Sequence, residues 1–545
     1  MTDDTNDLPN PDRRLLLGGL AAAIGAASVD SGAQAKTVAP RAHTNVDAAL
    51  RDKIDNVVVI FCENRSFNNL FADFPGLAQP LKNVPPERAL QRDRDGTPLK
   101  TLPPIWGGMV PQKQTVEHAD YQIGEGDITG LPNAPFALRA PDGDPLPHGV
   151  ITRDLVHAFY NNQLQINGGK NDGFVAWGDA GALVMGHYGE TSAKLRLRTI
   201  AREFTLCDNF FMGVFGGSFV NHQYLVTAKV PYYPHADQSP AKGGITRIDP
   251  TDPKGIRPLQ RAKSPASAME GPAKFEPNVL TPDFYAVNTM TPPYAPTWQL
   301  DANRPGYADW TAPSTLVPQT HKTIGDMLSA KNVDWAWYSG GWDAALARRE
   351  TTTFPQRPNF QVHHQPLNYF AQYAPGTPAR AHHLRDAGEG ESPRTNKLLA
   401  DIQAGKLPPV TFYKPQGNLN MHAGYSDVEA GDQHVAIILD ALRRSPQWDK
   451  MLVVVTFDEN GGWWDHVAPP KADRWGPGTR IPAILAGPHV KKGHVDHTVY
   501  DTGSILRFIT RRWGLERLPG LIERDTAMKA NSGFAPGDLT GALDL

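Results

Sequence analysis

Residues 451–467 read MLVVVTFDENGGWWDHV, and the rest of the chain is interpreted around them. The stretch opens with an apolar, β-branched run, the pattern of a short strand that is buried on both faces of a sheet. The run ends at Asp458, Glu459 and Asn460, which two glycines follow. Adjacent carboxylates at the end of a buried strand need water or a cation to stay ionised. Because ligands bind at the carboxyl edge of open α/β sheets, this is a candidate site.

A second stretch of the same design lies far upstream in the chain. Residues 57–61 (VVVIF) are followed by Cys62, Glu63 and Asn64, so an apolar strand again ends in a carboxylate and an amide. Taken alone, residues 451–467 also fit a strand with an ordinary acidic turn after it. Two such strands, distant in sequence, favour one shared site that the fold assembles.

The order of apolar patterns predicts the fold class. Expected strands at residues 333–338, 410–413 and 481–486 alternate with expected helices at 322–330, 392–404 and 432–443. This alternation implies right-handed crossovers, so we predict a three-layer α/β/α fold with a mainly parallel central sheet. Residues 231–318 are crowded with prolines and turn residues. We expect them to form a loop-rich insertion or cap that influences substrate preference.

Composition limits the class of protein. The chain has 545 residues, 40% of them hydrophobic and 20% charged, so it can bury a large core. A net charge of −3 and the lack of a long basic run argue against a nucleic-acid partner. Two cysteines occur, Cys62 and Cys207, and their spacing does not reveal whether they pair. We interpret both as small core residues rather than as metal ligands.

The N-terminus has the pattern of an export signal. Arg13 and Arg14 precede an apolar run at residues 15–29 that is short for a membrane span, and AQA at 33–35 resembles a signal-peptidase site. The paired arginines indicate the twin-arginine route, although neighbouring residues depart from that signal, and an ordinary signal peptide is the alternative. In both cases residues 1–35 would engage the export machinery, and the protein would be periplasmic or secreted.

The two acidic strand ends resemble motifs of a known family. IFCENRSFNNLF at residues 60–71 resembles the ENRSFD signature of the bacterial phosphoesterase family, which holds acid phosphatases and non-haemolytic phospholipases C. VVVTFDENGGWWDHVAPP at residues 453–470 resembles the matching DENGGxxDHVxPP stretch. The family has an alkaline-phosphatase-like core, so the resemblance implies that fold for residues 53–545. We expect residues 36–52 to form a flexible lead-in.

A glycine turn marks the candidate nucleophile. In residues 206–228 (LCDNFFMGVFGGSFVNHQYLVTA), two glycines precede Ser218 and a helix-compatible run follows it. A helix N-terminus offers N–H donors to an anion such as phosphate, whereas a serine at that position is usually only a helix cap. The segment resembles the family's turn that carries the nucleophilic hydroxyl, and this resemblance gives Ser218 that role.

Oxygen donors dominate the candidate metal site. The proposed ligands of one divalent ion are Glu63, Asn64, Ser218, Asp458 and Glu459. Hard oxygen donors suit Ca²⁺, Mg²⁺ or Mn²⁺ better than Zn²⁺, which favours nitrogen and sulfur. A bound cation would let the three carboxylates stay ionised together.

Further resemblances imply which residues handle phosphate and protons. Residues 154–175 resemble the family segment in which a histidine precedes NGG(K/R)xDGF, which implies that His157 lies near the site and places Lys170 loosely beside it. HHQP at residues 363–366 resembles the HHQPFxY element of the acid phosphatase branch. Without the resemblance, His157 fits an ordinary helical histidine and the HHQP histidines fit a surface pair.

These residues receive the following predicted roles. The catalytic residues are Ser218, His157 and His422, and the substrate-binding residues are His363, His364 and Lys170. The four histidines could hold phosphate oxygens or protonate the leaving alcohol, and the sequence does not separate these roles. The ordinary pKa of histidine, about 6.5, leads us to expect an acidic optimum.

The function expected from the sequence is an exported, metal-dependent phosphoric ester hydrolase of acid phosphatase type that acts on a phosphate ester substrate through a phosphoserine. The alternative is a phospholipase C that cleaves phosphatidylcholine-like lipids. It ranks second because residues 231–318 contain no long apolar run that could form a path for acyl chains. A non-catalytic binding protein on the same fold ranks third, since Ser218 and the metal ligands are all present.

Overall fold

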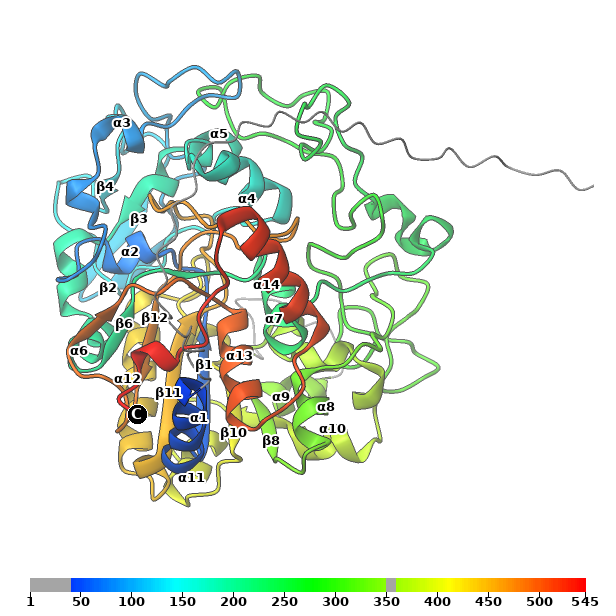
Figure 1. Cartoon of the computed structure of the whole chain (residues 1–545). Helices are drawn as coiled ribbons and strands as arrows, with labels where there is room; N and C mark the ends of the chain where they lie inside the picture. The colour runs from blue at the N-terminus through cyan, green and yellow to red at the C-terminus, as the bar shows by residue number, and fades with distance from the viewer. Residues whose placement is uncertain (1–40, 349–358) are drawn as a thin grey trace, which may run out of the picture. The chain divides into compact units, whose positions relative to one another are not determined.

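Strand β1 (Asn56–Cys62) lies near the middle of an eight-stranded sheet. It pairs in parallel with β11 (Met451–Phe457) on one side and with β10 (Val410–Lys414) on the other. Every residue of these three strands is buried, as the apolar runs of β1 and β11 predict. The computed structural model describes residues 41–348 and 359–545 of the chain (Figure 1).

The strand order of this sheet is β13-β6-β12-β11-β1-β10-β8-β9. The other strands are β6 (Thr205–Cys207), β8 (Trp335–Gly340), β9 (Leu384–Gly388), β12 (Ala483–Ala486) and β13 (His494–Asp496). Among these described strands, β12 runs against both of its neighbours, and all other pairs in the sheet are parallel. The sheet is therefore mainly parallel, as predicted.

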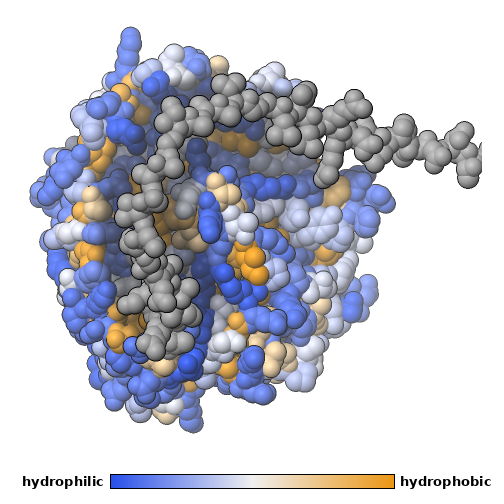
Figure 2. Space-filling view, in the orientation of Figure 1, coloured by the Kyte–Doolittle hydropathy of each residue, from blue (hydrophilic) through white to orange (hydrophobic). Residues whose placement is uncertain are grey.

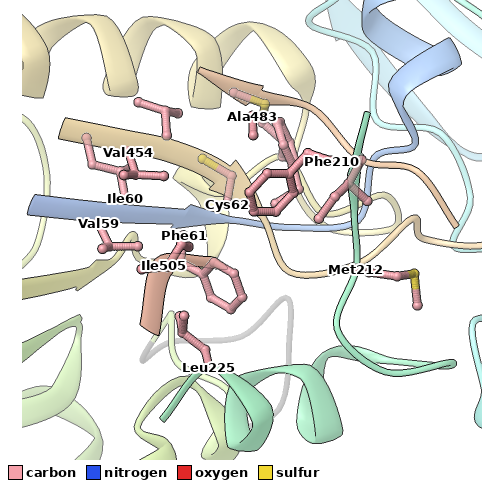
Figure 3. Packing of buried hydrophobic residues seen from close by; sticks show 14 of the residues in the cluster. Val59, Ile60, Phe61, Cys62, Phe210, Met212, Leu225, Val454, Ala483 and Ile505 are labelled. Atoms are coloured by element: carbon pink, nitrogen blue, oxygen red, sulfur yellow. The ribbon is translucent and has the colours of Figure 1, made fainter. Parts of the chain in front are cut away.

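Helices cover both faces of the sheet. Ile60 of β1 is in register with Tyr413, whose hydroxyl lies 2.6 Å from Nε2 of His434 in α12 (Val428–Arg443). The next residue, Phe61, points to the opposite face and contacts the ring of His222 in α7 (Ser218–Thr227) at 5.0 Å. Figure 3 shows Leu225 of α7 close to Phe61, together with Ile505. Helices thus lie on both sides of the strands, which confirms the three-layer α/β/α class.

Helix α12 packs against α6 (Arg196–Glu203) and α11 (Lys397–Gln403), and α7 packs against α13 (Gly503–Arg512) and α8 (Ile324–Ser329). The remaining helices are α1 (Arg41–Lys53), α2 (Phe67–Phe71), α3 (Pro86–Ala89), α4 (Phe159–Ile166), α5 (Phe174–Trp177), α9 (Trp342–Arg348), α10 (Pro378–His383) and α14 (Pro519–Ser532). The small sheets contain β2 (Val110–Val116), β3 (Ala119–Ile123), β4 (Phe136–Ala137), β5 (Gly186–His187), β7 (Phe210–Phe211) and β14 (Tyr500–Asp501).

Helix caps explain where the observed helices differ from the expected ones. Asp427 accepts a hydrogen bond from the backbone N–H of Ala430, so α12 begins before the expected residue 432. Asn396 caps α11 in the same way, and α11 therefore begins after the expected start at residue 392. These caps were not recognised from the sequence.

The expected flexible lead-in is largely helical. Within residues 36–52, the chain is helical from Arg41 onwards, because α1 spans Arg41–Lys53. Leu50 is buried in the core, and Asp47 accepts a hydrogen bond from Arg511 of α13 at 2.6 Å. Residues 36–40 and the predicted export signal, residues 1–35, lie outside the described part of the chain.

Residues 231–318 consist of loops with two short 3₁₀ turns, Ala236–Gln238 and Pro240–Gly244. Cys62 and Cys207 are buried free thiols, and burial raises the pKa of Cys62 to about 12. The face drawn in Figure 2 is mostly hydrophilic, with hydrophobic residues in small separate patches. Within residues 41–348 and 359–545, no helix is both long enough and apolar enough to cross a bilayer.

Truncation in the middle of β1 tests how much the sheet core contributes to stability. Ile60 is fully buried, so we expect Ile60→Ala to lower the free energy of unfolding by about 2–5 kcal/mol. Ile522→Ala is the matched control, because the Ile522 side chain is 50% exposed and should contribute about 0.5 kcal/mol or less. Denaturant unfolding measures both losses, and equal losses would contradict the assignment of β1 to the core.

Candidate active site

The carboxyl ends of β1 and β11 meet at one edge of the sheet. The two strands are parallel and in register up to the pair Cys62 and Phe457, so the residues after them lie side by side. The backbone N–H of Asn64 donates to Asp458 Oδ1 over 3.1 Å. Gly461 has a φ of +60°, and a Cβ there would collide with the backbone of Asn64, so the turn after Asp458 requires glycine. The structure thus assembles the shared site that the two motifs predicted.

Ser218 reaches this edge from the start of α7. Its Oγ lies 3.2 Å from Asn64 Oδ1 and 3.5 Å from Glu459 Oε1. The N-cap residue of α7 is Gly217, and the Ser218 side chain does not cap the helix. The hydroxyl therefore points to the acidic residues rather than serving as an ordinary helix cap.

The glycine turn presses Ser218 against the segment that carries His157. Gly216 has a φ of +97°, and a Cβ on it would lie 2.6 Å from the Cα and N atoms of Phe159. A Cβ on Gly217 would lie 3.0 Å from the carbonyl oxygen of His157. The turn and the segment before α4 are consequently in backbone contact, which larger residues would prevent.

The three carboxylates of the site are fully buried, and they differ in how far nearby positive groups offset their negative charge. Burial raises the pKa of Asp458, and it raises that of Glu459 well above the usual range. Burial alone would also raise the pKa of Glu63, but His364 and Lys414 hold it well below its usual range. Glu63 Oε1 lies 2.5 Å from His364 Nε2 and 2.8 Å from Lys414 Nζ. The negative charge of Glu63 is thus neutralised by the protein itself.

Asp458 and Glu459 are suited to a cation. Asp458 Oδ2 is buried and has no hydrogen-bond partner among the described residues. Asp458 Oδ1 already accepts from the backbone N–H groups of Asn64 and Glu459, at 3.1 and 2.8 Å. Together with Ser218 Oγ and Asn64 Oδ1, the two carboxylates form a set of hard oxygen donors, so these residues fit a metal ion. Ligating atoms of Glu63, His222 and Asp458 also lie within 4.8 Å of one another.

Two of the predicted catalytic histidines face each other across the site. The rings of His157 and His422 lie 5.5 Å apart, and His157 Nε2 is 3.8 Å from Glu459 Oε1. Burial alone would lower the pKa of His157, but the carboxylates of Glu459 and Asp154 raise it to about 9. His422 stacks on Tyr425 at 4.2 Å. His157 precedes α4, so the interpretation as a helical histidine is wrong.

The three predicted substrate-binding residues differ in their position relative to the pocket in front of Ser218. His363 lines the pocket in front of Ser218, with a side chain that burial keeps largely neutral by lowering its pKa. His364 is fully buried, with Nε2 2.5 Å from Glu63 Oε1, and is not among the residues that line the pocket. Lys170 is exposed and also absent from the pocket lining. Its position in the NGGKNDGF turn did not determine where its side chain lies.

Three residues that lie at the site were missed from the sequence. His222 lies one helical turn after Ser218, with Nδ1 2.7 Å from the Ser218 carbonyl oxygen and 3.7 Å from Asp458 Oδ2. Lys414 ends β10 at the same sheet edge, and Tyr425 donates to Glu63 Oε2 over 2.7 Å. The four-residue spacing from Ser218 and the charged end of a buried strand were available signals for His222 and Lys414.

These residues open into a pocket of about 790 Å³ whose lining is both polar and apolar. Its lining includes Asp154, His157, Ser218, His363, His422 and Tyr425, with Asn278, Asn288 and Trp298 contributed by residues 231–318. An adjacent pocket of about 630 Å³ is more apolar and is lined by Phe159, Tyr160, Phe215, Ile248, Ile256 and Trp475. Ala158 lines the first pocket and Phe159 the second, so consecutive residues separate them.

Comparison with known proteins agrees with this geometry. The model of the Phosphoesterase family matches residues 54–516. The chain belongs to the Phosphoesterase family. It is 24% identical over 542 residues to the non-hemolytic phospholipase C of Pseudomonas aeruginosa, covering 92% of this chain and 59% of that protein. It is 21% identical over 498 residues to phospholipase C B of Mycobacterium tuberculosis, covering 85% of this chain and 74% of that protein.

The chain therefore spans little more than half the length of the Pseudomonas relative. Among solved structures, the chain aligns with a protein of the alkaline phosphatase superfamily from Vibrio parahaemolyticus. The alignment covers 61% of this phosphoesterase chain and 63% of the Vibrio chain. That alignment has 10% identity and a TM-score of 0.29.

Substitution at the glycine turn tests how Ser218 is positioned. We expect Gly216→Ala to lower the free energy of unfolding by about 1–3 kcal/mol, because alanine is strained at positive φ. Phosphoester hydrolysis should fall by at least about tenfold, since Ser218 would be displaced. Gly243→Ala is the matched control, with no atom within 4 Å of the added Cβ. Thermal melts and initial rates measure both effects, and a fully active Gly216→Ala protein would contradict the argument.

Proposed function

We propose that this phosphoesterase hydrolyses phosphoric esters at a metal centre with Ser218 as the nucleophile. The observation that carries the proposal is the position of the Ser218 hydroxyl. It lies at the N-terminus of α7, does not cap that helix, and lies within 3.5 Å of Asn64 Oδ1 and Glu459 Oε1. A hydroxyl held between acidic groups and a helix N-terminus is suited to attack an anionic phosphoryl group.

One divalent cation would be held by Asn64, Ser218, Asp458 and Glu459, with Glu63 beside them. The donors are oxygen atoms, which favour Ca²⁺, Mg²⁺ or Mn²⁺ over Zn²⁺. When bound, the ion would neutralise the buried carboxylates and lower the pKa of the Ser218 hydroxyl. The unpartnered Asp458 Oδ2 supports this assignment.

The proposed reaction has two steps at the same phosphorus. Ser218 Oγ attacks the phosphorus, the bond from phosphorus to the ester oxygen breaks, and its electron pair leaves with the alcohol. Of His157 and His422, which both line the pocket, one would accept the proton of the Ser218 hydroxyl and one would protonate the leaving alkoxide. Water then attacks the phosphoserine, releases the phosphoryl product and restores the serine hydroxyl. His363, which also lines the pocket, would donate to a phosphoryl oxygen.

For the ester, we propose a substrate with an apolar alcohol, as in phospholipase C. Two observations favour it over the small phosphomonoesters expected from the sequence. The curated relatives that align with most of this chain are named phospholipases C. The apolar pocket lies next to the site, and its aromatic wall comes mainly from outside residues 231–318, where the sequence showed no acyl path. The acid phosphatase type is the second candidate, supported by the three histidines, His157, His363 and His422, that line the Ser218 pocket.

Export through the N-terminal signal belongs to the same proposal, and residues 1–35 are its sole support. A reporter enzyme fused to these residues and assayed in periplasmic and cytoplasmic fractions tests it, with Arg13→Lys plus Arg14→Lys as the variant specific to the twin-arginine route.

The nucleophile assignment predicts the effect of removing one oxygen atom. Ser218→Ala should lower kcat by at least about 10³-fold without lowering the thermal midpoint, because the hydroxyl forms the covalent intermediate. Mass spectrometry of acid-quenched wild-type protein should find the phosphoryl group on the peptide that contains Ser218. Activity of the variant within about tenfold of wild type would refute the role.

The metal assignment predicts a chelation effect and a specific variant. A chelator should inactivate the enzyme, and Ca²⁺, Mg²⁺ or Mn²⁺ should restore it. Asp458→Asn should lower metal content below half an equivalent per chain and kcat by about 10²-fold or more, because it removes a charged ligand. Asp237→Asn, at an exposed position, is the control and should match wild type. Full metal content in Asp458→Asn by elemental analysis would exclude this ligand.

The substrate assignment predicts a selective defect in the apolar pocket. Trp475→Ala should lower kcat/KM for long-chain phosphatidylcholine by at least about tenfold and change that for a small soluble phosphomonoester by less than about twofold. Trp310→Ala is the matched control, since this tryptophan is 40% exposed and lies outside both pockets. A wild-type protein that prefers the monoester would favour the acid phosphatase candidate instead.

A further inference from the structure

Asp334, His382 and His383 form a separate group of metal-ligating side chains, far from the catalytic edge. Asp334 directly precedes β8, whereas Glu63 and Asp458 follow the carboxyl ends of β1 and β11. Because β8 runs parallel to β10 and β1, its beginning lies at the opposite edge of the sheet. The two histidines end α10, which lies beside β8 (Figure 1). One ligand atom from each of the three residues lies within 4.8 Å of the other two.

His383 is held in the orientation and tautomer of a metal ligand. Its Nδ1 lies 2.7 Å from the Trp335 carbonyl oxygen, which can only accept, so Nδ1 carries the proton and Nε2 the lone pair. The ring also stacks on the Trp335 indole at 4.1 Å with an interplanar angle of 5°. Histidines that bind metals commonly donate their other N–H to a carbonyl group in this manner.

His382 and Asp334 complete the group. His382 Nε2 lies 2.8 Å from Asp334 Oδ1, and its ring is nearly perpendicular to that of His383, at 84° with centroids 4.6 Å apart. The backbone N–H of Trp335 donates to Asp334 Oδ1 over 2.8 Å and fixes the carboxylate. The side chains of His382 and Asp334 are 56% and 45% exposed, so an ion can reach them. Their ion pair alone would stabilise the fold only slightly.

The neighbouring cation does not block this group. Arg385 comes within 4.0 Å of Asp334 Oδ2, on the other oxygen of the carboxylate. Its Nε donates to the His382 carbonyl oxygen at 3.0 Å and its guanidinium also donates to the Tyr338 hydroxyl at 2.8 Å. These two hydrogen bonds hold the Arg385 guanidinium along the strand. Its contact with Asp334 is through Oδ2, whereas the contact of His382 is through Oδ1.

We propose that Asp334, His382 and His383 bind a transition-metal ion, with Zn²⁺ as the representative, at the start of β8. Two imidazoles and one carboxylate are a common ligand set for Zn²⁺, and water fills the fourth position of the tetrahedron. The ligands proposed for the catalytic ion are oxygen atoms, which hard cations prefer, so the two sites would differ in the metals they bind most tightly. The bound ion would join the end of α10 to Asp334, the residue that directly precedes β8.

Zinc titration of the full-length protein tests the proposal. Protein stripped of metal is titrated with Zn²⁺ by calorimetry in excess Ca²⁺, which occupies the oxygen-donor site. Wild type and Asp458→Asn should both bind one equivalent at the start of β8. His383→Ala should weaken this binding at least tenfold, about 1.4 kcal/mol. His118→Ala, at another exposed histidine, should not change it. Phosphoester hydrolysis by His383→Ala should equal that of wild type.

Spectroscopy on a milder variant separates ligation from misfolding. Cu²⁺ in place of Zn²⁺ should give an electron paramagnetic resonance spectrum with nitrogen couplings from two imidazoles in wild type and from one in His382→Gln, at unchanged thermal stability. The same Zn²⁺ stoichiometry and affinity in the His382→Ala, His383→Ala double variant would overturn the proposal. So would a wild-type protein that takes up no Zn²⁺ in excess Ca²⁺.

Discussion

The burial of three carboxylates at one edge of the central sheet is the constraint on which the site depends. Removing a carboxylate from water costs several kcal/mol unless a partner compensates it. Glu63 has Lys414 and His364, and Glu459 has His157, but Asp458 Oδ2 has no hydrogen-bond partner in the described chain. The fold therefore compensates the charges only in part. A cation at this edge, as proposed above, would complete the compensation and would link metal binding to the stability of the sheet.

The compensating groups come from distant parts of the chain. Lys414 ends β10, His364 lies in the loop region before β9, and His157 precedes α4. Ser218 depends on yet another contact, because its glycine turn is packed against the backbone at His157 and Phe159. None of these contacts is local in sequence. The active edge can therefore form only when the sheet, the start of α7 and the segment before α4 are in place.

The sequence predicted what depends on local pattern and missed what depends on tertiary contact. Strands β1 and β11 and the acidic residues that follow them were recognisable from the sequence. In each strand the apolar β-branched residues and the polar residues that end the run are consecutive in the chain. His364 could not be assigned from its motif, since adjacent histidines differ only in which neighbours the fold gives them. Likewise, the apolar pocket escaped notice because Phe159, Phe215 and Trp475 lie in three separate segments.

The seven-residue parallel register between β1 and β11 has a consequence for how such a protein can vary. Side chains alternate between the two faces of a sheet, so a one-residue insertion or deletion in either strand would turn its terminal carboxylate to the opposite helix layer. Loops elsewhere can lengthen or shorten with little effect on this edge. We therefore expect evolution to constrain the lengths of these two strands more strongly than the identities of their apolar residues.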